Sequence, residues 1–575
     1  LFITLNNGKE KMVKKDTKQM DNLTKYKRQS FVQAAILLAV IILLNIFSSH
    51  SYFRLDLTQD NRYTLGEPTI NLLNELDDQV YVKIYLEGEL PAGFRKLKES
   101  TRELLDEMRN STKTKIEYDF IDPLESGNAK EQQEIYQQLI EMGLEPVNLE
   151  VQTEGNKTQK IIFPGAIIFY KNKQIPLKLL KQQIATAPDE VLHNSIVSLE
   201  YEFSNAIRKL ASNSKSRIAF IEGHGELDKD QTQDIYNTLS EFYEVKRIHL
   251  PSFKVGILDD FDLAIVAKPD SQFNDLEKYK LDQFIVKGGR VLWLVESLMA
   301  NMDSLATNGG VTTTLDYDLN LKDLFFHYGI RLNYNLVQDI QCHLIPVLVN
   351  QGAPQQDFRP WIYFPVVFPA TNHPIVNNLN ACLFQFASSI DTIANKSIRK
   401  TVLLSSSAQS RMVYNPARIS LADVNTNPDE QLFNKGPQIL SVLIEGSFNS
   451  FFKDYLSPST LKSGNYGTFQ ENGIPTKMIF ISDGDVIANQ QSRVRDQYFP
   501  LGYDRFTKQT FGNKNLILNA VDYLLDDSGL MQLRSKQFKL RLLDKSKSTN
   551  DKLKWQIINM LLPIIFILLF GLLFA

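Results

Sequence analysis

Polar residues that could bind a ligand or a metal follow four apolar segments of the chain. The segment "IAFIEGHGEL" (218–227) ends in acidic residues and one histidine between two glycines. Similar residues follow "LAIVA" as "KPD" (268–270), "VLWLV" as a single glutamate, and "KMIFI" as "SDGD" (482–485). In an open parallel sheet, ligands bind outside the carboxyl ends of the strands, where the strand order reverses. The sequence therefore predicts a candidate crevice lined by Glu222, His224, Glu226, Lys268, Glu296, Asp483 and Asp485.

These residue types could hold a metal or a polar ligand, but a turn explains them as well. Strands in such sheets are followed by Gly, Asp and Asn because the backbone must turn there, whatever the protein does. "GHGE" has one histidine and no cysteine, so it does not match a zinc pattern. "DGD" lacks the further oxygen ligands of a calcium loop. We interpret the segments as structural turns and keep ligand or metal binding as the alternative.

No motif of the chain indicates covalent, redox or nucleotide chemistry. Cys342 and Cys382 are the two cysteines, which fit neither a zinc ligand set nor a disulfide framework. We interpret them as buried thiols, with a single bridge between them as the alternative. His343 is a poor base for Cys342, because neighbours on a strand point to opposite faces. The chain has no G-x-S-x-G elbow and no Walker loop. The expectation is a protein that is not an enzyme, with no cofactor and no resident metal.

Composition points to globular structure and away from nucleic acid. Lys and Arg number 63 against 66 Asp and Glu, so a net charge of −3 provides no basic field for a phosphate backbone. The 43% hydrophobic and 22% charged content is that of ordinary globular protein. A chain of 575 residues is long enough for two to four folded units.

The strand ends that carry the polar residues belong to a predicted α/β domain at 198–530. From 217 to 297, apolar strands alternate with helices, an order typical of a mostly parallel sheet covered by helices on both faces. "LAIVA" and "VLWLV" are apolar throughout, as central strands are. The region 303–433 is rich in Asn, Pro and Gln, so we expect an irregular insertion there. The prediction is a doubly wound sheet.

A smaller domain is predicted at 52–190. "QVYVKIYLEG" alternates as a strand, "FRKLKESTRELLDEMRNS" has apolar residues at helical spacing, and "KIEYDFIDP" is a second strand. A helix, "KEQQEIYQQLIEMG", and a hairpin, "KIIFPGAIIFYKNKQIPL", complete it. This order resembles a thioredoxin-like domain, but no C-x-x-C is present, so redox chemistry is not implied.

Apolar segments near both ends are predicted to span a membrane. The first, at 31–49, follows a basic N-terminal segment (1–30), which keeps that end cytoplasmic. A cleaved signal peptide is the alternative, although "SSHSYF" offers no A-x-A site. The second, at 556–575, follows a charged linker at 531–554, and we expect a short tail beyond it. Both termini are then cytoplasmic and the body between them is periplasmic.

The arrangement as a whole resembles a known family. The basic flank and first anchor, the pair "RLDLT" and "RYTL" (54–58 and 62–65), "EGHGE", "GGRVLWLVE" and the second anchor are together similar to GldG. That family is the auxiliary, or substrate-binding, component of the gliding-motility ABC transporter of Bacteroidetes. The resemblance implies a GldF-like permease and a GldA-like cytoplasmic ATPase as partners in the inner membrane. It also implies a fold like the class I glutamine amidotransferases for the second domain, without their chemistry, because no cysteine occupies the nucleophile turn.

Two other functions remain open at this stage. A periplasmic solute-binding receptor would use the strand-end crevice for a polar ligand. A membrane-tethered enzyme would hold a metal on Glu222, His224 and Asp483.

Overall fold

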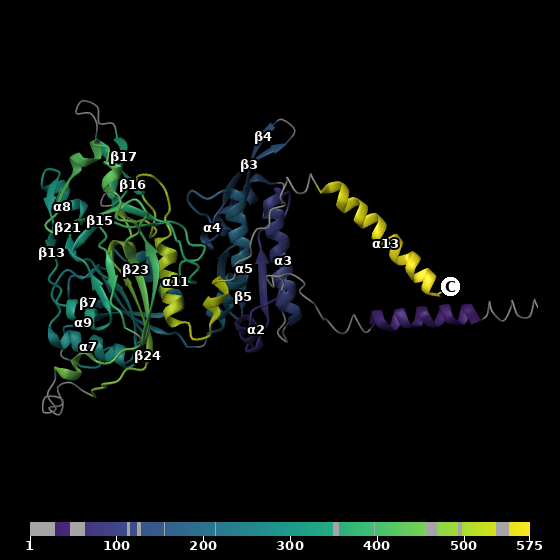
Figure 1. The fold of residues 1–575 in the computed structure, drawn as a ribbon, viewed down its shortest axis with the longest axis horizontal. Helices are drawn as coiled ribbons and strands as arrows, with labels where there is room; N and C mark the ends of the chain where they lie inside the picture. The colour runs from purple at the N-terminus through teal and green to yellow at the C-terminus, as the bar shows by residue number, and fades with distance from the viewer. Residues whose placement is uncertain are drawn as a thin grey trace, which may run out of the picture. The chain divides into compact units, whose positions relative to one another are not determined.

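The computed structural model describes residues 29–46, 64–111, 116–123, 128–153, 156–212, 214–252, 254–348, 356–395, 397–455, 468–492, 497–535 and 551–574. The chain divides into two units, Leu1–Thr64 and Leu65–Ala575, and the second holds every labelled strand (Figure 1). Helices and strands alternate through this second unit, so the predicted mixed α/β class is confirmed.

The first sheet has four strands in the order β2-β1-β5-β6. β1 and β2 are parallel and connected by α3, whereas β5 and β6 form an antiparallel hairpin. The expected strands, helix and hairpin are therefore present. The elements of this region are α2 (Glu67–Asn74), β1 (Val80–Ile84), α3 (Ala92–Ser111), β2 (Ile116–Phe120), α4 (Ala129–Glu141), β3 (Val147–Thr153), β4 (Asn156–Ile162), β5 (Gly165–Tyr170), β6 (Lys173–Lys178) and α5 (Pro188–Ala211).

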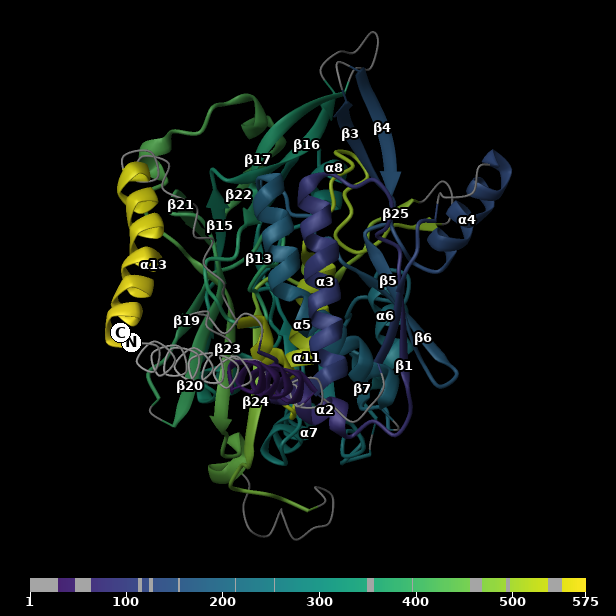
Figure 2. The same cartoon turned by 90° about the vertical axis from the view of Figure 1, so that its right-hand side faces the viewer.

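Helices cover both faces of this sheet. α3 and α5 lie side by side over one face (Figure 2), where Leu105 and Phe203 share a core with Val82 of β1. α4 covers the other face, where Leu139 packs with Ile167 of β5. The segment "EYEFSNAIRKLAS" (200–212) predicts a helix from its sequence. It lies in the second half of α5, and its buried face completes the core of this first sheet.

The second sheet has seven strands in the order β20-β23-β24-β10-β9-β7-β8. The five strands from β24 to β8 are parallel, and β23 runs antiparallel to β24. The chain passes from β7 to β8 on one side and then to β9 on the other side of β7, so the strand order reverses there. The strands are β7 (Arg217–Glu222), β8 (Glu244–His249), β9 (Leu263–Ala267), β10 (Arg290–Leu294), β20 (Ile398–Ser405), β23 (Ile439–Ser447) and β24 (Pro475–Ile481).

The two faces of this sheet pack into separate cores. Phe220 of β7 packs in one core with Leu239 of α6 (Gln233–Phe242) and residues of α11 (Asn513–Leu525). Its neighbour Ile221 packs in the other core with Phe284 of α7 (Asp275–Val286). Successive strand residues point to opposite faces, which is why one apolar strand can serve both cores.

The region 303–433, predicted to be an irregular insertion, contributes a strand to the main sheet. β20 lies in this region, where "TVLLSSS" (401–407) predicts a short strand. It pairs with β23, a strand that was not predicted from the sequence. Its other strands pair mostly with each other, as β16 does with β17. The elements between β10 and the last helix that are not named above include β11 (Leu298–Met299), α8 (Met302–Thr307), β12 (Val311–Thr313), β13 (Leu315–Asp316), α9 (Lys322–His327), β14 (Ile330–Leu332), β15 (Asn335–Asp339), β16 (Cys342–Leu348), β17 (Gln356–Val367), β18 (Cys382–Leu383), β19 (Ile390–Thr392), β21 (Ser410–Tyr414), β22 (Arg418–Ser420), β25 (Gln491–Ser492) and β26 (Gln497–Tyr498).

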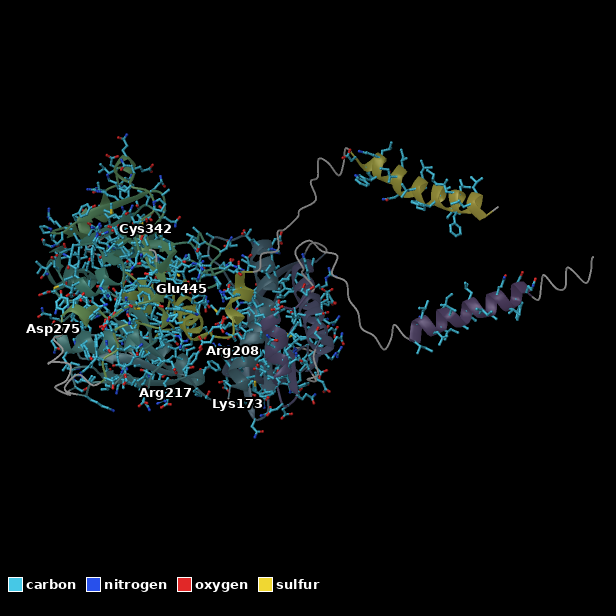
Figure 3. All side chains as sticks on the ribbon, turned by 60° about the horizontal axis from the view of Figure 1, so that its bottom comes forward. Lys173, Arg208, Arg217, Asp275, Cys342 and Glu445 are labelled. Atoms are coloured by element: carbon cyan, nitrogen blue, oxygen red, sulfur yellow. The ribbon has the colours of Figure 1, made fainter. Side chains whose placement is uncertain are left out.

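Two helices near the ends of the chain are long and apolar enough to cross a membrane. They are Gln29–Ile46 and α13 (Lys552–Phe574). In each helix, no part of the apolar stretch of 18 residues is buried inside the protein. Figure 3 shows that the sticks along both are mostly carbon. α13 begins at Lys552, four residues before the predicted start at 556, so the end of the predicted linker is helical. Two predicted segments, 1–30 and 531–554, lie mostly outside the described residues. The same is true of the pair at 54–58 and 62–65, of which Thr64 and Leu65 are described.

Candidate functional site

Three strand ends bring Lys268, Glu296 and Asp485 into contact. These residues follow β9, β10 and β24, which are parallel neighbours, so their carboxyl ends meet at one edge of the sheet. Lys268 Nζ lies 3.1 Å from Glu296 Oε1 and 2.6 Å from Asp485 Oδ1. Glu296 is only 1% exposed. The structure thus gathers one ammonium and two carboxylates at a largely buried place.

Asp483 adds a third, fully buried carboxylate to this strand-end cluster. Its Oδ1 accepts a hydrogen bond of 2.8 Å from the backbone N–H of Asp485, and its Oδ2 accepts one of 2.5 Å from that of Gln385. Glu296, Asp483 and Asp485 each offer an oxygen within 4.8 Å of the others, so together they could hold a metal ion. We refer to Lys268, Glu296, Asp483 and Asp485 as the acidic cluster.

The backbone is bent closely around the acidic cluster. Gly484 donates its N–H to Glu296 Oε1 at 3.2 Å. A Cβ at this position would lie 2.3 Å from Cβ of Lys268, so only glycine allows the two turns to approach. Lys268 itself has a φ of 56°, a left-handed conformation that non-glycine residues rarely adopt. The surrounding structure holds Lys268 in this strained conformation.

Burial dominates the electrostatics of the acidic cluster. It raises the pKa of Glu296 to about 8, although the charge of Lys268 opposes the shift. Burial also raises the pKa of Asp483 well above its usual range, and the charges of Asp485 and Glu296 raise it further. The pKa of Lys268 is lowered by burial but raised more strongly by Asp485 and Glu296, so the net shift is upward. Lys268 therefore stays charged while two of the carboxyl groups retain protons readily.

His224 belongs to a different set of contacts. Its Nδ1 lies 3.2 Å from Glu226 Oε1 and its Nε2 lies 3.1 Å from Glu277 Oε2. The ring stacks on Phe273 with the two centroids 3.6 Å apart, and His224 is 2% exposed. Burial lowers the pKa of His224, but the hydrogen bonds and charges of the two glutamates raise it more, so the net shift is upward. Both ring nitrogens are thus engaged by carboxylates.

Glu222 pairs with an arginine of the neighbouring strand β8. Its Oε1 accepts a hydrogen bond of 2.9 Å from Arg247 of β8, whose guanidinium also donates to the backbone carbonyls of Leu227 and Asp228. The seven predicted crevice residues therefore form three groups: the acidic cluster, the pair His224 and Glu226, and Glu222. The metal-dependent enzyme considered above would need Glu222, His224 and Asp483 together. Each of these residues lies in a different one of the three groups.

Several partners in these groups were not identified from the sequence. Glu277 is one of them, although the run "NDLE" (274–277) predicts a capped helix start; Asn274 and Glu277 do form a capping box for α7. Gln385 lies 98 residues before Asp483, and no local signal connects them. Burial, and after it the charge of Glu296, raises the pKa of the Tyr317 phenol to about 12.

The two cysteines are not activated nucleophiles. Both are free; Cys382 is buried and Cys342 is half-buried. Burial raises the pKa of Cys342 to about 11, and it raises the pKa of Cys382 as well. A reactive thiol needs a lowered pKa, so neither residue suits covalent chemistry at neutral pH.

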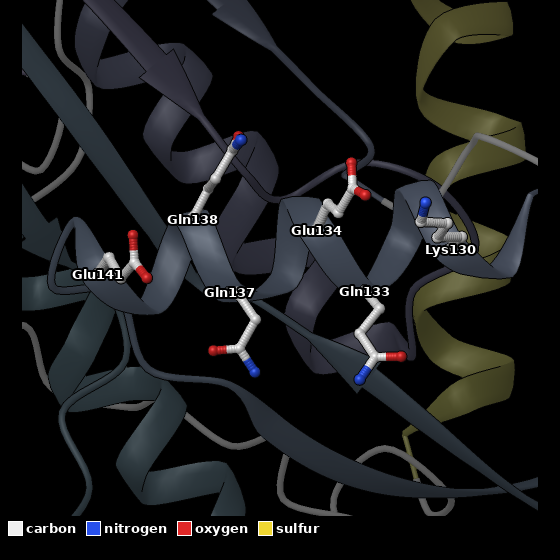
Figure 4. A pocket seen from close by; sticks show the side chains of 6 residues that line it. All are labelled: Lys130, Gln133, Glu134, Gln137, Gln138 and Glu141. Carbon is white, nitrogen blue, oxygen red and sulfur yellow. The ribbon is translucent and has the colours of Figure 1, made fainter.

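A hollow on the described surface lies away from these residues. It has a volume of about 490 Å³ and opens along the polar side of α4 (Figure 4). All of its lining residues come from that one helix, and none belongs to the predicted crevice: Lys130, Gln133, Glu134, Gln137, Gln138 and Glu141.

Comparison with known proteins identifies the family. A family model for an auxiliary protein, described as "ABC-type uncharacterized transport system", matches residues 215–520, more than half of the chain. The chain belongs to this ABC-transport auxiliary family. The match spans the whole second sheet and the acidic cluster. A second model, described as a domain of unknown function (DUF7088), matches residues 59–169 within the region of the first sheet.

Two further similarities were found. The chain is 22% identical over 561 residues to an uncharacterized protein of Borreliella burgdorferi, covering 95% of this chain and 98% of that protein. The solved structure titled "mmIFT52 N-terminal domain" matches with a TM-score of 0.30 and 13% identity, covering 54% of this chain and 99% of that one.

Proposed function

We propose that this member of the ABC-transport auxiliary family is a non-catalytic, membrane-anchored subunit of a transport complex in the bacterial inner membrane. The observation that carries the proposal is the pair of exposed apolar helices, Gln29–Ile46 and α13, in a chain whose central region matches a transport family. Side chains that cannot be buried in the protein are stable in lipid or against other membrane helices.

The finer features follow from the resemblance to GldG. The partners are a polytopic GldF-like permease and, through it, a GldA-like cytoplasmic ATPase, in a complex needed for gliding motility. Both termini are cytoplasmic and the body is periplasmic. ATP hydrolysis by the partner on one side of the membrane is coupled, through the two anchors, to the body on the other side.

The domain assignments are part of the same proposal. The order β2-β1-β5-β6, with β5 and β6 antiparallel, supports a thioredoxin-like first domain. The parallel order β8-β7-β9-β10-β24, with helices on both faces, supports a doubly wound second domain like that of the class I glutamine amidotransferases. Without a reactive cysteine, this domain binds or transmits rather than catalyses.

A topology experiment tests the periplasmic placement. Ala306 is an exposed residue of α8, and Ala306→Cys changes its side chain little. We expect a membrane-impermeant maleimide to label this variant in spheroplasts with an intact inner membrane. The parent chain, which has Cys342 and Cys382, is the control for maleimide labelling of these two native cysteines. A second variant, Thr24→Cys in the N-terminal segment, should react only after lysis. Labelling of Ala306→Cys only after lysis would place the body in the cytoplasm and refute the proposed topology.

A further inference from the structure

The acidic cluster holds more carboxyl groups than cations in a largely buried place. Three carboxyl groups, those of Glu296, Asp483 and Asp485, lie together with the single ammonium of Lys268. Glu296 is 1% exposed and Asp483 is fully buried, so water screens neither of them well. Buried carboxylates are normally balanced by paired cations or by a metal.

Lys268 does not satisfy every oxygen of the acidic cluster. Its ammonium contacts Glu296 Oε1, which also accepts the N–H of Gly484. Glu296 Oε2 is buried and has no hydrogen-bond partner among the residues that the structure describes. A buried oxygen without a hydrogen-bond partner destabilises the fold, so such an atom calls for a ligand.

The oxygens needed for that ligand are already close together. Glu296, Asp483 and Asp485 each present one oxygen within 4.8 Å of the other two. Both oxygens of Asp483 accept one backbone N–H each, which fixes the carboxylate and leaves further lone pairs. The ends of two neighbouring strands, β10 and β24, hold these side chains, so the arrangement rests on the sheet and not on one flexible loop.

We propose that Glu296, Asp483 and Asp485 bind one hard divalent cation, of the class of Mg²⁺, Mn²⁺ or Ca²⁺. Carboxylate oxygens without histidine or cysteine select this class over zinc or copper. The ion displaces the protons that Glu296 and Asp483 retain without it. Its two positive charges and that of Lys268 then equal the three negative charges of the carboxylates. Lys268 keeps its contacts with Glu296 Oε1 and Asp485 Oδ1, while the unpartnered Glu296 Oε2 faces the ion.

The test is a Mn²⁺ titration of the detergent-purified full-length protein after removal of metals with EDTA. Free Mn²⁺ is measured by electron paramagnetic resonance, and Mg²⁺ and Ca²⁺ are added as competitors. Asp485→Asn changes the most exposed of the three ligands and is the milder variant; Glu296→Gln removes the unpartnered oxygen. Asp260→Asn, at a carboxylate whose side chain is 77% exposed, is the matched control.

We expect about one Mn²⁺ per chain in the parent protein and in Asp260→Asn. Binding should weaken at least tenfold in Asp485→Asn and in any Glu296→Gln protein that folds, as judged by circular dichroism. Mn²⁺ should also raise the unfolding temperature of the parent but not of Asp485→Asn. Absence of stoichiometric binding to the folded parent, or equal binding by Asp485→Asn and Asp260→Asn, would overturn the proposal.

Discussion

His224 is held between two carboxylates, one from its own turn and one from the first turn of α7. Glu226 and Glu277 engage its two ring nitrogens, and Phe273 covers one face of the ring. The arrangement favours the protonated imidazole, which can donate to both glutamates at once. The contacts of His224 therefore support the structural interpretation of the "EGHGE" segment over a ligand site, because this residue joins the β7 turn to α7.

This arrangement predicts a pH-dependent contribution of His224 to stability. Its folded-state pKa is raised above the ordinary value of about 6.5, so its contribution is complete below that pH and is lost as the pH rises through the folded-state pKa. We expect His224→Gln to lower the denaturation midpoint of the full chain more at pH 6 than at pH 9. Urea unfolding in detergent across that range measures the difference. A loss of stability in His224→Gln that is equal at the two pH values, or larger at pH 9, would contradict a protonated His224.

Strand-end residues could be predicted from the sequence because turns after parallel strands meet at one edge whatever the rest of the chain does. That reasoning placed Lys268, Glu296 and Asp485 together. It could not separate His224 from them, because the choice between neighbouring partners depends on side-chain direction. Gln385 was not predictable either, since only the folded chain brings it to Asp483.

At the scale of elements, α5 and α11 are joined by a buried ion network. Asp522 of α11 accepts hydrogen bonds from Tyr243 at 2.6 Å and from Asn205 and Lys209 of α5 at 3.1 Å each. Burial raises the pKa of Asp522, but the charges of Lys209 and Arg208 lower it more, so the net shift is downward. Because α5 completes the core of the first sheet and α11 that of the second, this network links the two cores.

Removing the charge of Asp522 should destabilise this contact. Asp522→Asn leaves Lys209 and Arg208 beside a neutral partner, and breaking a buried pair in this way costs about 3 kcal/mol. Of these two basic residues, Arg208 is labelled in Figure 3. The lowered pKa means that the contribution is present above about pH 4 and disappears as the pH falls through the folded-state value. Urea unfolding of the full chain at pH 7 and pH 3.5 measures both effects. A variant as stable as the parent at pH 7 would show that the network contributes nothing.

Elements with a clear hydrophobic periodicity could be predicted from the sequence, whereas elements without it could not. β7, β9, β10 and α7 have long apolar runs or clear caps, which depend only on local sequence. β20 and β23 are added to the sheet from distant parts of the chain, and their pairing is set by the edge of the sheet that remains open. α5 was predicted too short because its first half buries its apolar residues against α3, a contact that no local pattern reveals.

At the scale of the whole molecule, two apolar helices and a folded α/β body agree with membership of an ABC-transport auxiliary family. Both helices were predictable because length and composition alone decide whether a segment can span a membrane. The partners of these two helices could not be predicted, because the sequence of a membrane helix does not show what packs against it. We therefore infer that these helices belong to a larger complex.

Purification of the tagged full-length chain in a mild detergent from its native host, with mass identification of its partners, tests that claim most directly. An unrelated membrane-anchored protein with the same tag is the control. The account predicts a stoichiometric polytopic ABC permease, accompanied by its ATPase, with this chain and not with the control. A chain that is stable and monodisperse alone, with no permease at native expression, would contradict it.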